Sequence, residues 1–275
     1  MTDAFSSACD AHLHIYDPRF ASQSPLEPNA SSPQYSVLQK QFGLSRAVIV
    51  QPRVYGTDNS ATLQAIQDLG RDNTRGIAVV DRDITDAQLA ALHDGGIRGV
   101  RFSFHSPNKS AGDFDSVMHI AQRIAPYGWH VQLHWTADQI AGQEALLQQL
   151  PVPIVFDHMA RLPLDASFSH PAFGIVRNLL RSGRAWLKLS GPYLNTAFGV
   201  DGGYADATQI AQAWVEAAPE QLVWGSDWPH VTEPANKKPS DTELFELLDL
   251  WCGSSAIKQQ ILVTNPARLY GFSDH

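Results

Sequence analysis

The chain has few of the features that mark secreted, membrane-spanning or nucleic-acid-binding proteins. Only two cysteines, Cys9 and Cys252, occur among 275 residues, too few for a disulfide framework and consistent with a reducing compartment. No run of eighteen apolar residues occurs, and the first residues lack the basic and apolar regions of a signal peptide, so we expect a cytoplasmic protein without a membrane partner. Lysine and arginine total 20 against 28 aspartates and glutamates, and the net charge of −8 argues against nucleic acid as a partner.

The residues that are present fit a single folded unit. Hydrophobic residues make up 44% of the chain, which is enough to bury a full core, and the 17% of charged residues are too few for a disordered or coiled-coil protein. No internal repeat, low-complexity tail or linker divides the sequence, so we expect residues 1–275 to form one domain; the oligomeric state is left open. Histidine is the unusual component, with 11 residues.

Short apolar or alternating segments recur along the chain and predict eight β-strands. These segments are 9–16, 47–53, 75–81, 97–104, 130–135, 154–159, 186–190 and 222–228. Longer segments with apolar residues on one face predict the helices between them. These are 59–71, 86–93, 114–126, 137–150, 171–182, 205–217, 242–252 and 254–262, the last ending before Asn265-Pro266.

Strict alternation of strands and helices implies parallel strands joined by right-handed crossovers. Eight such units close most economically into a single (β/α)8 TIM barrel of the α/β class. A doubly wound open sheet is the alternative, but no Gly-x-Gly-x-x-Gly follows a predicted strand. In a barrel, the long segments after strands form the carboxyl rim, where active sites lie. Those segments are 17–33, 106–113, 161–170, 191–204 and 229–241.

Histidines and one aspartate close four of the predicted strands. His12 and His14 end the first strand, and with a period of two their side chains point to the same side, into the barrel. His134 ends the fifth strand, His158 the sixth and Asp227 the eighth. Imidazoles beside a carboxylate can hold a divalent metal or stabilise an oxyanion, so we expect these five residues to form a site at the carboxyl rim.

The other histidines have simpler explanations. His130 begins the fifth strand and is expected to hydrogen-bond inside a packed core, which is also the alternative for His134. Exposed or helix-surface positions are expected for His93, His105, His119, His170 and His275.

These residues, at these strand ends, resemble the amidohydrolase superfamily, whose pattern is His-x-His on strand one, His on strands five and six, and Asp on strand eight. Further strings resemble the branch of that superfamily that contains 2-pyrone-4,6-dicarboxylate lactonase, and they extend over essentially the whole chain. The strings are VQPRVYGTDN (50–59), GVRFSF (99–104), GWHVQLH (128–134), FDHMAR (156–161), WGSDWPH (224–230) and NPARLYGF (265–272).

The resemblance implies a (β/α)8 barrel that acts on carboxylated lactones, and members of this branch often need no metal. The fourth predicted strand ends Arg101-Phe-Ser103-Phe-His105, without the Lys or Glu that bridges two metals elsewhere in the superfamily. We therefore expect no required cofactor and no binuclear centre. The alternative is a single divalent ion, zinc or manganese, held by His12, His14, His134 and Asp227.

The resemblance also implies arginines that bind substrate carboxylates. Arg101 and Arg161 match that pattern, and Arg53 stands where a small residue is commoner. Tyr193 and Asn195 stand where the lactonase carries a further arginine, and neither can replace the charge of a guanidinium. We therefore expect a small anionic lactone with one carboxylate or several hydroxyls rather than the pyrone dicarboxylate.

Polar side chains near the rim complete the expected substrate contacts. They are Tyr55, Thr57, Asn59, Ser103, His134, Tyr193 and His230. Loop capping is the alternative for Asn59, and an ion pair with Asp165 is the alternative for Arg161.

The expected reaction is hydrolysis of the lactone ester in a catabolic context. Asp227 activates a water, and His12, His14 and His158 donate hydrogen bonds to the carbonyl oxygen or hold a metal that polarises it. Three alternatives remain open at this point: isomerisation of the lactone ring on the same residues, metal-dependent decarboxylation of an unsaturated or aromatic acid, and a catalytically silent barrel that binds a carboxylated metabolite.

Overall fold

Eight parallel strands form the centre of the protein. The computed structural model describes residues 7–27, 30–105, 113–164 and 168–273. Each strand pairs with the next along the chain, in the order β1 to β8. The strands are β1 (Cys9–Leu13), β2 (Arg46–Val50), β3 (Thr74–Ala78), β4 (Ile97–Ser103), β5 (His130–His134), β6 (Ile154–Phe156), β7 (Ala185–Leu189) and β8 (Leu222–Trp224).

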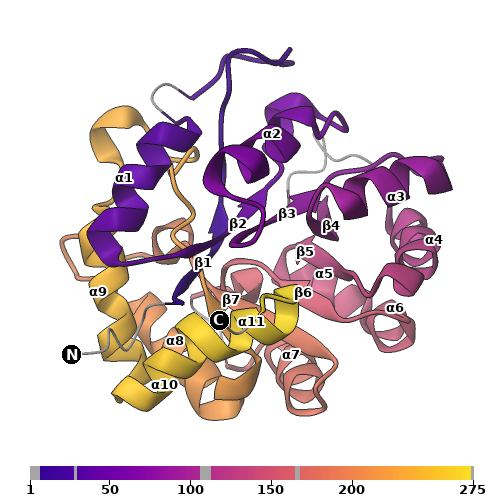
Figure 1. Ribbon diagram of the computed structural model, residues 1–275. Helices are drawn as coiled ribbons and strands as arrows, with labels where there is room; N and C mark the ends of the chain where they lie inside the picture. The colour runs from indigo at the N-terminus through magenta and orange to yellow at the C-terminus, as the bar shows by residue number, and fades with distance from the viewer. Residues whose placement is uncertain (1–6, 28–29, 106–112, 165–167, 274–275) are drawn as a thin grey trace.

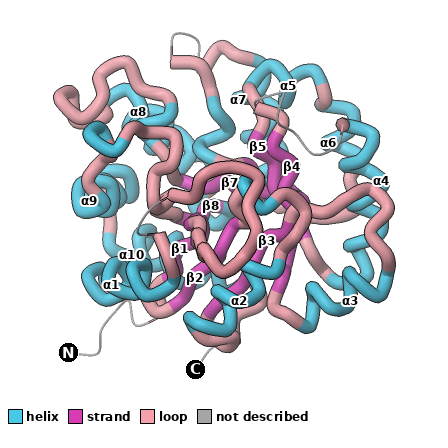
Figure 2. The backbone as a smooth tube through the Cα atoms, turned by 90° about the horizontal axis from the view of Figure 1, so that it is seen from above, coloured by secondary structure: helices cyan, strands magenta, loops and turns pink. Residues whose placement is uncertain are grey.

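The last strand returns to the first and closes the sheet. The amide of Asp227 donates to the carbonyl of His12, and the amide of His14 donates to the carbonyl of Trp228, each over 2.8 Å. Viewed from above, the helices surround the strands on all sides (Figure 2). The predicted (β/α)8 TIM barrel is therefore confirmed, and the open-sheet alternative is excluded.

The helices alternate with the strands and form the outer layer (Figure 1). The α-helices are α1 (Ser32–Phe42), α2 (Ser60–Leu69), α3 (Asp86–Asp94), α4 (Phe114–Ile124), α5 (Ala137–Gly142), α6 (Glu144–Gln149), α7 (Pro171–Arg181), α8 (Ala205–Ala217), α9 (Asp241–Cys252), α10 (Ser255–Gln259) and α11 (Asn265–Tyr270). No helix in the described ranges combines the length and the apolar content that a membrane crossing needs.

Helix α1 is absent from the sequence prediction, which has no helix between the first two strands. Ser31 caps it in an extended conformation, and the Ser31 amide donates to Gln34 Oε1. Pro33 lies in the first turn, where its missing N–H costs nothing. The sequence pattern predicts a rim loop over 17–33, but the proline at its end lies in the first turn of a helix.

Two helices differ from the prediction, because one is interrupted and the other is longer. The predicted helix 137–150 is two helices, because Gln143 leaves the helical conformation between α5 and α6. At the C-terminus the prediction ends before Pro266, yet the helix continues through a π-helical turn, Gln260–Thr264, into α11. Pro266 lies in the first turn of α11, where its missing N–H is tolerated.

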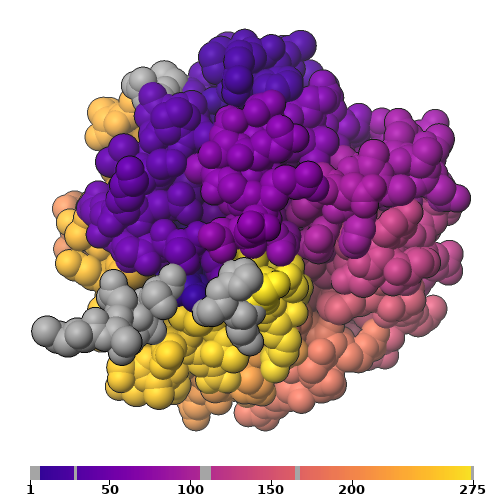
Figure 3. All heavy atoms as spheres, viewed as in Figure 1, coloured from indigo at the N-terminus to yellow at the C-terminus, as the bar shows by residue number. Residues whose placement is uncertain are grey.

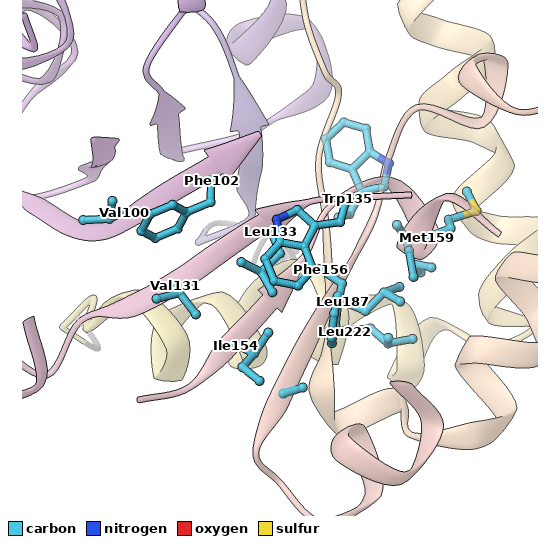
Figure 4. Close-up of a cluster of buried hydrophobic side chains, with 14 of the residues drawn as sticks. Val100, Phe102, Val131, Leu133, Trp135, Ile154, Phe156, Met159, Leu187 and Leu222 are labelled. Atoms are coloured by element: carbon cyan, nitrogen blue, oxygen red, sulfur yellow. The ribbon is translucent and has the colours of Figure 1, made fainter. Parts of the chain in front are cut away.

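The core has two layers that follow the alternation of side chains along the strands. The outer layer packs the strands against the helices, for example Phe102, Leu133 and Phe156 (Figure 4). The inner layer fills the lower barrel with Cys9, Ala11, Val48 and their neighbours, and Tyr270 and Phe272 close it from below. Figure 3 shows the C-terminal segment, in yellow, packed against indigo and purple residues of the first part of the chain.

All eight strands end earlier than predicted, and the ends of β1, β6 and β8 shape the site. Strand β1 contains a register shift between Asp10 and Leu13. Strands β6 and β8 stop at Phe156 and Trp224, short of the predicted ends at 159 and 228. After them the chain turns sharply through left-handed conformations that apolar patterning does not reveal. The residues with positive φ are His158, Met159, Ala160, Arg161, Asp227 and His230.

Candidate active site

The predicted strand-end residues meet at the carboxyl end of the barrel. The ring centres of His12 and His14 lie 5.1 Å apart, and those of His12 and His158 lie 4.7 Å apart. Asp227 Oδ1 faces both residues of the His-x-His pair, 3.5 Å from His12 Nε2 and 3.6 Å from His14 Nε2. The ring of His134 adjoins that of His158, 5.2 Å between centres. The structure thus brings all five predicted residues into one cluster.

Asp227 is a buried carboxylate with two different oxygens. Oδ1 faces the histidines, whereas Oδ2 accepts a 2.6 Å hydrogen bond from the hydroxyl of Tyr193. Burial alone raises the pKa of the Asp227 carboxyl, but the imidazoles of His158, His14 and His12 outweigh it, and the pKa lies well below its usual value. Asp227 is therefore ionised at neutral pH and can accept a proton.

The three histidines around Asp227 are each anchored through Nδ1. His14 Nδ1 lies 2.8 Å from the carbonyl of Val50, and His158 Nδ1 lies 2.9 Å from Ser190 Oγ. His12 Nδ1 lies 3.4 Å from Lys188 Nζ and 3.3 Å from Asp157 Oδ1.

Burial keeps two of these imidazoles neutral. It lowers the pKa of His158 to about 4 and that of His12 well below its usual value, and neighbouring positive charge lowers the His12 value further. His12 Nε2 is a buried atom without a hydrogen-bond partner among the described residues. One donor atom each from His12, His158 and Asp227 lies within 4.8 Å of the others, a set that could hold a cation. This set has His158 in place of the predicted ligands His14 and His134.

Two charged residues behind His12 were missed from the sequence. The fully buried Asp157 accepts a 2.9 Å hydrogen bond from Arg101 Nε, and the fully buried Lys188 donates a 2.7 Å bond to the carbonyl of Ala11. Lys188 Nζ lies 3.4 Å from His12 Nδ1 and 4.0 Å from Asp157 Oδ1. Burial lowers the pKa of Lys188 to about 8, against the opposing effect of Asp157. A lysine flanked by leucines in a buried strand is the sequence signal that could have found it.

The side of the site near β4 contains a second histidine pair. His134 Nδ1 lies 3.0 Å from Ser103 Oγ, and its ring stacks on His105 with centres 4.9 Å apart. His105 Nε2 lies 2.8 Å from Arg161 Nη2, whose Nη1 donates to the carbonyl of Leu194. The expectation of an exposed or helix-surface His105 is therefore wrong, because strand β4 delivers its half-buried ring to the site.

The rim residues after β2 are engaged in loop contacts. The hydroxyl of Tyr55 bonds to the backbone of Asp17, and Thr57 Oγ1 donates to Asp81. Asn59 Nδ2 donates to the carbonyl of Val79, which matches the capping alternative. Arg53 is exposed at the start of a 3-10 turn. The role of these four side chains in substrate binding stays a prediction.

His230, the last of the predicted substrate contacts, lies beside Tyr193. His230 Nδ1 lies 3.1 Å from Tyr193 Oη, and its Nε2 lies 2.9 Å from Asp241 Oδ1. His170 caps α7 and faces Asp138. Asp165, the alternative partner of Arg161, and His275 lie outside the described residues.

A (β/α)8 barrel whose first, sixth and eighth strands end in His-x-His, His and Asp defines an amidohydrolase. The chain belongs to the amidohydrolase family, which residues 9–272 match. It is 33% identical to 2-pyrone-4,6-dicarboxylate hydrolase of Comamonas testosteroni and 34% identical to 4-sulfomuconolactone hydrolase of Rhizobium radiobacter; in both cases the match covers 96% of this chain and 90% of the relative.

A crystal structure has the same fold. It is that of a candidate 2-pyrone-4,6-dicarboxylic acid hydrolase from Pseudomonas putida, 28% identical, with a TM-score of 0.86 over 98% of this chain and 99% of that one. The resemblance stated from the sequence motifs is therefore confirmed at the level of the family.

Proposed function

We propose that this protein is a hydrolase that opens the ester of a small carboxylated lactone, with Asp227 as the base. The observation that carries the proposal is the position of Asp227 Oδ1, an ionised oxygen that faces His12 Nε2 at 3.5 Å inside a barrel mouth lined by histidines. The names of the two curated relatives, both hydrolases of small lactones or pyrones, support it.

The same geometry suggests how the water is held and activated. A water bound to Asp227 Oδ1, beside His12 Nε2, gives one proton to Asp227 Oδ1. Its oxygen attacks the lactone carbonyl, and the ring C–O bond then breaks while protonated Asp227 returns its proton to the leaving alkoxide. No covalent enzyme intermediate is needed.

His158 is the best placed of the neutral histidines to stabilise the oxyanion. If Ser190 donates to Nδ1, the proton of the neutral imidazole is on Nε2, available to the developing negative charge. The sequence predicts all three histidines as donors, and the geometry favours His158 among them.

The cationic groups fit a substrate with a single carboxylate near the reacting carbonyl. Arg101 uses Nε for Asp157, which leaves the outer edge of its guanidinium for an anion. Arg161 is committed through Nη1 to Leu194 and through Nη2 to His105. One open guanidinium edge matches one carboxylate. Tyr193, which stands where the family resemblance implies a further arginine, agrees with this.

His12, His158 and Asp227 also suit a divalent ion such as zinc or manganese, because two imidazoles and a carboxylate are common ligands and His12 Nε2 lacks a partner among the described residues. When bound, such an ion would polarise the carbonyl or lower the pKa of water.

The decisive experiment is Asp227→Asn, assayed by NMR against a panel of sugar-acid and muconic-type lactones. We expect kcat to fall by at least about a thousandfold, because general-base and charge contributions are lost together. Asn tolerates the left-handed φ of 59° at this position, so the fold should be retained. Asp72→Asn, an exposed change at the opposite end of the barrel, is the matched control.

Each result has a distinct meaning. Retained turnover in Asp227→Asn overturns Asp227 as the base. A product with a new lactone ring instead of an open hydroxy acid indicates an isomerase, and carbon dioxide release indicates a decarboxylase. Full activity after chelation and elemental analysis excludes a required metal, whereas activity restored only by zinc or manganese establishes one.

A further inference from the structure

The two oxygens of Asp227 are not equivalent, and one residue accounts for the difference. The Asp227 backbone is fixed by the bond from its amide to the His12 carbonyl, but rotation about its side chain would exchange Oδ1 and Oδ2. The Tyr193 hydroxyl, 2.6 Å from Oδ2, opposes that exchange. Oδ1 is consequently the oxygen that faces His12 and His14.

Tyr193 is itself in contact with a second residue, His230. An ionised carboxylate only accepts hydrogen bonds, so the single hydroxyl proton of Tyr193 is given to Asp227 Oδ2. Tyr193 Oη also lies 3.1 Å from His230 Nδ1, and the ring of His230 meets that of Tyr193 edge to face at 5.2 Å. On its far side His230 Nε2 lies 2.9 Å from Asp241, the first residue of α9.

The chain Tyr193–His230–Asp241 joins three separate segments of the fold. Tyr193 lies in the 3-10 turn after β7, Pro192–Leu194. His230 follows β8 in a tight turn, in which the His230 amide donates to the Asp227 carbonyl. This arrangement explains why a tyrosine can stand where the family resemblance implies an arginine: its hydroxyl is used on Asp227 rather than on a substrate anion.

We propose that Tyr193, oriented by His230 and Asp241, is a positioning residue that holds Asp227 Oδ2 and reserves Oδ1 for the attacking water. This inference rests on the proposed role of Asp227 as the base. It assigns Tyr193 and His230 a role different from the substrate contacts expected from the sequence.

Tyr193→Phe tests the proposal, because it removes one hydroxyl and keeps the ring. We expect kcat to fall by about ten- to a hundredfold, as for loss of a hydrogen bond to a charged group, with KM changed by less than about threefold. His230→Gln should lower kcat by about three- to tenfold, because Tyr193 remains but is less well oriented. Tyr127→Phe, which removes a hydroxyl near the start of β5, is the control and should leave both constants unchanged.

The double variant separates positioning from substrate contact. If His230 acts through Tyr193, adding His230→Gln to Tyr193→Phe lowers kcat by no more than about twofold further. Multiplying effects, or a KM that rises while kcat is kept, overturns the proposal in favour of direct substrate binding. Wild-type kinetics in Tyr193→Phe with an inactive Asp227→Asn refutes this inference alone, whereas an active Asp227→Asn refutes the proposed function.

Discussion

The two ends of the barrel bury charge in opposite ways. At the amino end, Arg75 donates to the backbone carbonyls of Arg71 and Gly271, and Arg46 donates to that of Ser273. Both guanidinium groups also pack on the ring of Phe272, at 4.7 and 5.2 Å from its centre. At the carboxyl end, by contrast, the buried groups His12, Asp157 and Asp227 face one another.

This difference separates stability from chemistry within one fold. Backbone carbonyls are fixed acceptors, so the arginines at the amino end tie residues 271 and 273 to the first strands. Buried nitrogens without a hydrogen-bond partner in the described part of the chain occur at both ends, and such groups are destabilising: Arg46 Nη1, Arg75 Nε and His130 Nε2 at the amino end, and His12 Nε2 and His134 Nε2 at the carboxyl end. The two at the carboxyl end belong to the histidine cluster around Asp227. Their persistence is expected where a substrate or water completes the contacts.

The largest effect on stability is expected from Phe272→Ala. The change opens the floor of the inner core and removes the surface on which Arg46 and Arg75 stack, so unfolding should become easier by about 3 kcal/mol. Chemical denaturation followed by circular dichroism measures this loss, and kcat measured well below the new midpoint should stay within about twofold of wild type.

A matched control removes an equally large ring elsewhere. Phe198 is 60% exposed, so Phe198→Ala should change the stability by less than about 0.5 kcal/mol. A Phe272→Ala protein as stable as Phe198→Ala, or one that folds fully but has lost its activity, would show that the amino end is not the purely structural region described above.

The next largest effect is on substrate binding, at the carboxyl end of strand β4. Arg101→Gln removes the charge assigned to the substrate carboxylate and should raise KM by about a hundredfold. Arg101→Lys keeps a charge without the planar fork and should raise KM by about tenfold. Steady-state kinetics on the best lactone of the panel measures both changes.

Arg98 supplies the comparison on strand β4. It bonds to the carbonyls of His93 and Ile97 at the amino end, so Arg98→Gln should leave KM unchanged and act only on stability. If Arg98→Gln raised KM as much as Arg101→Gln, or if Arg101→Gln altered only the melting temperature, the proposed carboxylate site would be wrong.

The sequence predicts most of the architecture because strand and helix periodicities are local. Apolar alternation locates all eight strands, and strand ends point to His12, His14, His158 and Asp227. Where the prediction fails, the cause is a conformation that patterning does not encode. Helix α1 depends on a cap and an early proline, and strands β6 and β8 are ended by left-handed residues.

The contacts between charged and polar residues inside the site could be predicted only in part from the sequence. Asp157 and Lys188 meet because β6 and β7 are paired neighbours in the sheet, so neither partner is visible from its own segment. The direction of the Tyr193 hydroxyl depends on the turn after β7 and on His230, which lies 37 residues further along the chain. Chemistry-bearing residues are thus easier to predict than the residues that orient them.

The smallest expected effect compares two buried histidines from the two ends. His130, at the start of β5, was expected to hydrogen-bond in the core, but its Nε2 has no partner among the described residues. Burial, helped by Lys188 and opposed by Asp157, lowers its pKa to about 3. Because the unfolded chain binds a proton near pH 6.5 and the folded one does not, stability falls as the pH is lowered from about 6.5 toward 3.

His130→Gln should therefore reduce the acid-side slope of stability, by up to about 1.4 kcal/mol per pH unit, when urea unfolding is measured between pH 7 and 4.5. His158→Gln, which removes a histidine of pKa about 4 at the carboxyl end, should reduce the slope similarly. The two variants should differ in catalysis, since only His158 faces Asp227 and the proposed oxyanion. Equal slopes in wild type and His130→Gln would mean that His130 is protonated in the fold, and loss of activity in His130→Gln would extend the functional region to the floor of the barrel.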